Sequence, residues 1–153
     1  MAKINDFIKL AQNMEIRGIE FYEKAFKLAQ VEEVRETFRF LIEEEKEHVR
    51  FFEKLLEKDW DVEISAESSR YLKGIFDFPF LGEKELEEVS RYTREKEALE
   101  LAAQAEKDAI LFYQELSNVI LDEKLKDAIG KIIEEEKMHL VAIRERIYEL
   151  LSD

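Results

Sequence analysis

Two stretches of this sequence nearly repeat each other: Ile42-Glu43-Glu44-Glu45-Lys46-Glu47-His48 and Ile133-Glu134-Glu135-Glu136-Lys137-Met138-His139. They lie 91 positions apart, and the same offset carries Glu15 onto Glu106 and Tyr22 onto Tyr113 without a gap. Of the 39 positions from 10 to 48, 13 are identical to their counterparts. A repeat of this kind predicts two copies of one structural unit, related by an approximate twofold axis.

Apolar residues recur at helical spacing on both sides of each repeated stretch, which predicts four amphipathic helices. The sequence contains only four Gly and one Pro, so breaks within these helices are rare. Asp122 is a suitable N-cap for the last helix. The predicted helices span about residues 5–29, 33–58, 93–119 and 122–151.

The lengths of the connections predict the topology. Short turns join the first helix to the second and the third to the fourth, so each pair is expected to form an antiparallel hairpin. The hairpins span about 5–58 and 93–151, within a single domain of residues 1–153. The segment between them, about 59–90, is rich in aromatic residues and long enough to run the length of the bundle. We expect this crossover to pack along the bundle or against a second subunit.

Composition excludes several classes of function. The net charge of −13 disfavours nucleic acid and anionic membranes as partners. The absence of cysteine excludes disulfides, thiolate metal sites and cysteine nucleophiles within this sequence. The sequence contains no apolar run of the roughly 20 residues that a membrane span needs, and its start lacks a signal-peptide pattern. We therefore expect a cytoplasmic protein.

Charged or polar residues interrupt the apolar stripe near the middle of every helix. The first and third helices each contribute one carboxylate. The second and fourth helices each contribute a Glu-x-x-His pair, whose i, i+3 spacing places both side chains on one face. The six residues are Glu15, Glu106, Glu45, His48, Glu136 and His139.

Four carboxylates and two imidazoles in a helical core predict a metal site. An unpaired buried carboxylate is costly, and no Lys or Arg interrupts the same central stretches as a counter-ion. Two divalent cations would neutralise the charge, and this donor set suits iron, manganese or zinc. The other glutamates of the repeated stretches fall off the stripe and are expected to be solvated: Glu43, Glu44, Glu47, Glu134 and Glu135. The alternative is a helical interaction module in which the buried carboxyl groups are simply protonated.

Two further pairs of residues lie on the same faces. Tyr22 and Tyr113 each follow a single-Glu position by seven residues, either as core side chains or as hydrogen-bond donors to a ligand carboxylate. Gly18 and Ala109 follow the same positions by three residues. These small side chains either leave room for a substrate or allow close helix packing.

The pattern resembles the ferritin-like di-iron carboxylate superfamily, in particular its rubrerythrin and bacterioferritin branches. The resemblance covers both hairpins and implies a ferritin-like antiparallel four-helix bundle with two iron ions. By motif match, Glu15 and Glu106 would be the single-Glu ligands, and Glu45-Lys46-Glu47-His48 and Glu136-Lys137-Met138-His139 would supply the rest. Glu45 and Glu136 would be the bridging carboxylates. The resemblance also implies a homo-oligomer, at least a dimer.

The resemblance implies an oxidoreductase that reacts with peroxide or dioxygen, as a rubrerythrin-like peroxidase or a ferroxidase. The sequence departs from rubrerythrins in two respects. It lacks the four cysteines of a rubredoxin-like domain, so electrons would come from a separate donor protein, and Ala109 replaces an additional Glu. Iron storage or delivery and a dimanganese catalase remain alternatives.

Overall fold

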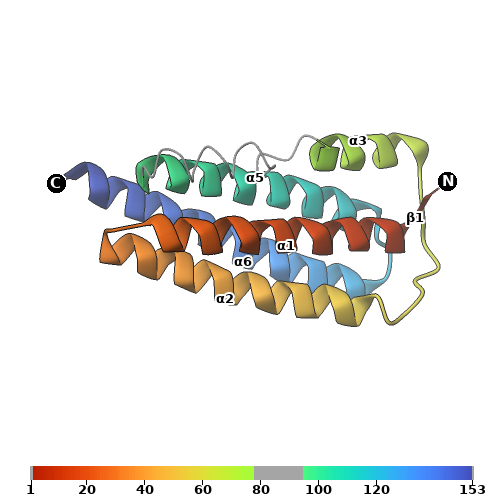
Figure 1. The fold of residues 1–153 in the computed structure, drawn as a ribbon. Coiled ribbons are helices and arrows are strands. Elements are labelled where there is room, and N and C mark those ends of the chain that lie inside the picture. Colours follow the sequence, from red (N-terminus) through yellow and green to blue (C-terminus); the bar gives the residue numbers. More distant parts are fainter. Residues whose placement is uncertain (1, 78–94, 153) are drawn as a thin grey trace.

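Four long helices run side by side in the computed structural model, which describes residues 2–77 and 95–152 (Figure 1). They are α1 (Ile4–Leu28), α2 (Glu32–Leu55), α5 (Glu95–Val119) and α6 (Glu123–Ser152). The helix α1 packs mainly on α2, and α5 packs mainly on α6. The predicted all-α bundle of two antiparallel hairpins is therefore confirmed.

The helix ends lie close to the predicted positions. One side-chain oxygen of Asp122 accepts a hydrogen bond of 2.9 Å from the backbone N–H of Leu125, as expected of an N-cap. The helix α2 ends at Leu55, three residues earlier than predicted. There the backbone N–H groups of Glu57 and Lys58 bond to carbonyls only three residues back, which replaces the α-helical ladder with a tight turn.

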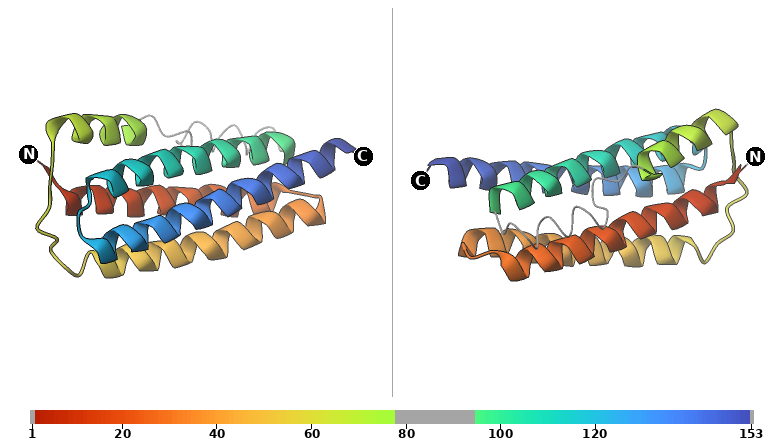
Figure 2. Two further views of the ribbon diagram at one scale, coloured as in Figure 1. Left: turned by 180° about the vertical axis from the view of Figure 1, so that it is seen from behind. Right: turned by 45° about the horizontal axis from the view of Figure 1, so that its top comes forward.

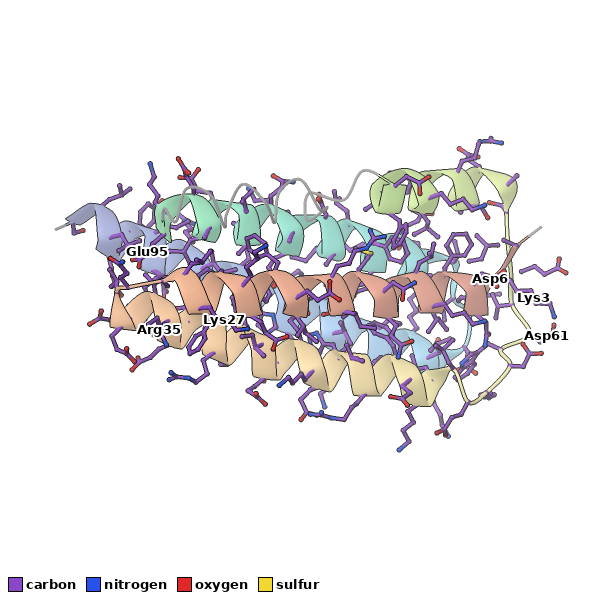
Figure 3. The ribbon with its side chains drawn as sticks, in the orientation of Figure 1. Lys3, Asp6, Lys27, Arg35, Asp61 and Glu95 are labelled. Atoms are coloured by element: carbon purple, nitrogen blue, oxygen red, sulfur yellow. The ribbon has the colours of Figure 1, made fainter. Side chains whose placement is uncertain are left out.

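Charged side chains fasten the turn between α1 and α2. Figure 3 shows Arg35 and Glu95 at this end of the bundle. One guanidinium nitrogen of Arg35 donates to the carbonyls of Phe26 and Ala29, at 2.8 and 3.1 Å. The carboxylate of Glu95, at the start of α5, accepts from the backbone N–H of Val31 at 2.8 Å. The first hairpin is thus held to the second at this end.

The residues before α1 and the first part of the crossover form elements that the sequence did not predict. Strand β1 (Ala2–Lys3) pairs antiparallel with β2 (Glu63–Ile64), and helix α3 (Ala66–Asp77) follows. Figure 2 shows α3 beside α5, near the strand pair. The side chain of Leu72 is buried, and α3 contacts α5 and α1. This part therefore packs along its own bundle, as expected, whereas the predicted crossover residues 78–90 lie outside the described residues.

The apolar core is divided into two clusters. One cluster, which includes Phe7, Phe52 and Ile129, lies at the end that carries the strand pair. The other, which includes Phe38 and Leu99, lies toward the turn between α1 and α2. A layer of buried polar side chains separates them. Over residues 2–77 and 95–152, no helix is long and apolar enough to cross a membrane.

Candidate metal centre

The six residues predicted to interrupt the apolar stripes form the polar layer between the two clusters. Each is at most 3 % exposed. One carboxylate comes from α1 and one from α5, and a Glu-x-x-His pair comes from each of α2 and α6. The layer contains Glu15, Glu45, His48, Glu106, Glu136 and His139.

The layer consists of two overlapping groups of potential ligands. The ligand atoms within each group lie within 4.8 Å of one another. Both groups share Glu45 and Glu136, one from each hairpin. The first group adds Glu15 and His48, and the second adds Glu106 and His139. This arrangement is compatible with two metal ions bridged by the shared carboxylates.

The Nδ1 atom of each imidazole faces the carboxylate oxygens. The Nδ1 atom of His48 lies 2.8 Å from Oε1 of Glu136 and 3.5 Å from Oε1 of Glu15. The Nδ1 atom of His139 lies 3.2 Å from Oε1 of Glu45 and 3.7 Å from Oε1 of Glu106. Ligand atoms about 2.1 Å from one metal ion stand about 3 to 3.5 Å apart, so these spacings suit a shared ion.

Both predicted tyrosines contact the layer as hydrogen-bond donors. The hydroxyl of Tyr22 on α1 donates to Oε1 of Glu106 on α5 at 2.7 Å. The hydroxyl of Tyr113 on α5 donates to Oε1 of Glu15 on α1 at 2.6 Å. Burial raises the pKa of both phenols well above its ordinary value, so they stay protonated and remain donors. Each tyrosine therefore orients a carboxylate of the other hairpin.

Two glutamates expected to be solvated instead contact the imidazoles. Oε2 of Glu135 lies 2.6 Å from Nε2 of His48, at hydrogen-bonding distance. Oε1 of Glu44 lies 3.6 Å from Nε2 of His139. Both carboxylates are partly buried between α2 and α6. The prediction that Glu44 and Glu135 are solvated holds only in part, because each side chain is partly exposed but also lies against a histidine of the other hairpin.

The carboxyl groups of the layer differ in their protonation. Burial and the charge of Glu106 raise the pKa of Glu136 well above its ordinary value. Burial also opposes ionisation of Glu106, but contacts with Glu136, His139 and Tyr22 outweigh it and lower the pKa of Glu106. Without a metal ion, these shifts favour the protonated form of Glu136 and the ionised form of Glu106.

Both imidazoles favour the charged form in the absence of metal. Burial opposes the charge on His48, but the oxygens of Glu136 and Glu15 outweigh it and raise its pKa to about 12. Burial likewise opposes the charge on His139, and Glu106 raises its pKa. Protons therefore partly neutralise the layer when no cation does so.

A cavity adjoins the polar layer between α1 and α5. Its volume, about 40 Å³, is enough for a molecule the size of peroxide or dioxygen. The four carboxylates and both tyrosines line it, together with the small residues Gly18, Ala105 and Ala109. Its remaining lining, which the sequence did not indicate, comes from Met14, Arg17, Ile75 and Asp108.

An antiparallel four-helix bundle with a Glu and Glu-x-x-His layer defines the class of ferritin-like diiron-carboxylate proteins. Within that class, the chain belongs to the rubrerythrin family, whose sequence model matches residues 6–147. A search among curated proteins finds no match.

Two solved structures share this fold. One is a protein from Thermotoga maritima that has been provisionally assigned to the ferritin-like diiron-carboxylate proteins. It is 25 % identical, with a TM-score of 0.69 over 97 % of this chain and 96 % of that chain. The other is a hypothetical protein from Pyrococcus furiosus, 23 % identical, with a TM-score of 0.71 over 97 % of this chain and 90 % of that chain.

Proposed function

We propose that this chain is a di-iron oxidoreductase that reacts with peroxide or dioxygen, with rubrerythrin-like peroxidase or ferroxidase activity. One observation carries the proposal. Each of the six residues of the polar layer has at least one buried oxygen or nitrogen atom without a hydrogen-bond partner among the described residues, and His139 has two. Such atoms are costly unless a further group satisfies them. Two cations at the shared carboxylates would satisfy one such atom on each of the six residues.

The donor set fits iron. Carboxylate and imidazole ligands suit iron, manganese and zinc, and the membership of the rubrerythrin family favours iron. One ion would be held by Glu15, His48 and the shared carboxylates, and the other by Glu106, His139 and the same two carboxylates. When bound, a pair of iron ions supplies two electrons to an oxidant, one from each ion.

The chain's own residues prepare the site for this chemistry. Tyr22 and Tyr113 keep their protons and fix Glu106 and Glu15 by donation, so these carboxylates hold their positions as charge changes. The apolar clusters on both sides of the layer exclude bulk water. The cavity has room for a small oxidant beside the carboxylates.

Electrons for turnover would come from a separate donor protein, since the residues of this sequence include no cysteine to build an iron–sulfur site. We further propose that the protein acts as a homodimer or a larger oligomer and resides in the cytoplasm, where such donors are available.

The test is metal content per chain after purification from cells supplemented with iron and manganese. We expect two iron ions per chain, lost in a Glu45→Ala/His139→Ala variant and kept in Glu134→Gln, which changes an exposed neighbouring carboxylate. The iron-loaded protein should then be oxidised by peroxide or dioxygen in anaerobic stopped-flow mixing. Two manganese ions with oxygen release from peroxide would instead indicate a catalase, and a large hollow assembly would indicate storage. Absence of metal after reconstitution would overturn the proposal.

A further inference from the structure

The contacts outside the ligand layer follow the 91-residue repeat. Tyr22 and Tyr113 are counterparts at this offset, and each donates to a carboxylate of the opposite hairpin. Glu44 and Glu135 are also counterparts, and each faces the outer nitrogen of the opposite hairpin's histidine. The two halves of the centre would therefore be equivalent if these contacts had equal lengths.

The contacts of the two histidines are unequal. Nε2 of His48 is at 2.6 Å from Oε2 of Glu135. Nε2 of His139 is buried and has no hydrogen-bond partner among the described residues, since Oε1 of Glu44 is 3.6 Å away. One imidazole is thus anchored by a carboxylate, whereas the other is not.

A difference in sequence accompanies this inequality. The ring of Phe40 meets the ring of His139 edge to face, with 5.7 Å between centroids. The counterpart of Phe40 in the second hairpin is Lys131, whose side chain is exposed. His48 therefore has no equivalent aromatic neighbour at that position. The asymmetry is therefore present in the sequence as well as in one side-chain distance.

A carboxylate on the outer nitrogen of a histidine changes its quality as a ligand. It fixes the tautomer, so that Nδ1 presents its lone pair to the metal, and it makes the imidazole a stronger donor. Loss of such a partner costs about 10- to 100-fold in metal affinity. Packing against an aromatic ring orients His139 but supplies neither effect.

We propose that the two metal positions are inequivalent. The position formed by Glu15 and His48 binds its ion more tightly than the position formed by Glu106 and His139, and Glu135 is the positioning residue that creates the difference. The inference rests on the proposed function, because it requires that both positions bind metal.

The test is a titration of chelator-treated protein with Co²⁺, followed by visible absorption and by competition with a chelating dye. The wild-type protein should bind two ions in two resolved steps. Glu135→Gln should weaken the tight step by about 10- to 100-fold. Glu44→Gln should change either step by less than about threefold, because its carboxylate makes no hydrogen bond to the imidazole. Glu134→Gln removes an exposed charge from the same turn and controls for general electrostatics.

Two further variants assign the steps without altering Glu135. Glu15→Gln should abolish the tight step, and Glu106→Gln should abolish the weak one. Two indistinguishable wild-type steps, or equal effects of Glu44→Gln and Glu135→Gln, would overturn the inference while the two-metal centre stands. Failure of the wild-type protein to bind Co²⁺, Fe²⁺ or Mn²⁺ at all would overturn the proposed function itself.

Discussion

Metal-free protein should lose stability as the pH rises from about 5.5 to about 6.5, and Glu136 should cause most of the loss. Burial and the charge of Glu106 raise the pKa of Glu136 well above 4.5, its value in an unfolded chain. In this range the folded chain holds a proton that the unfolded chain has released. The stabilisation is therefore complete below pH 4.5 and is lost as the pH rises.

The size of the effect follows from the linkage of protons to folding. One proton held only by the folded state changes the free energy of unfolding by up to about 1.4 kcal/mol per pH unit. For a chain of this length that corresponds to a fall in Tm of about 3 to 5 °C. His48 and His139 add smaller losses of the same sign, because an unfolded histidine begins to release its proton within this range while the raised pKa values keep the folded ones charged. The lowered pKa of Glu106 makes the stability depend on pH mainly below about pH 4.5, where its contribution is lost as the pH falls.

The assay is thermal unfolding by circular dichroism in the presence of a chelator, at both pH values. Glu136→Gln resembles the protonated carboxyl group and cannot release a proton, so its Tm should fall by less than about half as much as that of the wild type, the remainder coming from His48 and His139. Glu134→Gln, which alters an exposed carboxylate, should keep the wild-type slope. A wild-type Tm that stays constant or rises, or a Glu136→Gln variant with the wild-type slope, would refute the assignment of the proton.

Three further predictions follow from single contacts. Gly18→Leu should fill the cavity and lower the rate of iron oxidation at least about tenfold with the metal content unchanged. Gly18→Ala, whose added Cβ would lie 3.9 Å from Tyr22, should retain the wild-type rate. Equal rates in both variants would exclude the cavity as the route of the oxidant. Tyr113→Phe removes the donor to Glu15 and should lower stability by about 1.5 to 3 kcal/mol in thermal unfolding, whereas Tyr71→Phe, at an exposed tyrosine, should change it little. Asp122→Ala should lower the Tm by about 2 to 4 °C through loss of the helix cap, and Asp122→Asn should not; an unchanged Tm in the alanine variant would show that the cap is dispensable.

The helices and their pairing were predictable because burial imposes a period on the sequence. Each helix has one apolar stripe along most of its length, and the short turns leave only antiparallel hairpins. The strand pair formed by Ala2–Lys3 and Glu63–Ile64 was not predictable, since two residues carry no period. Helix α3 was also missed, because its 12 residues lie in a segment whose apolar content indicated packing but not conformation.

The composition of the polar layer was predictable for the same reason. A glutamate or histidine at an inward position interrupts the apolar stripe and can therefore be recognised in the sequence. Glu44 and Glu135 did not stand out, because they lie at the edge of the stripe, where a carboxylate usually faces solvent. The shared offset of 91 residues did not single them out either, because it pairs the exposed Glu43 and Glu134 in the same way. Which histidine atom each carboxylate contacts depends on how α2 packs against α6. The sequence of one helix alone does not determine that packing.

The polar layer ties the two hairpins together, because its contacts cross from one to the other. Tyr22 and Tyr113 each donate to a carboxylate of the opposite hairpin, and Nδ1 of His48 lies against Glu136 of α6. One hairpin alone offers three potential ligands. It lacks the tyrosine that donates to its single glutamate, because that tyrosine lies on the other hairpin. A complete centre therefore requires both hairpins to be docked. Metal binding should thus stabilise the docking of the hairpins more than the helices themselves, since the binding free energy becomes available only in the docked state.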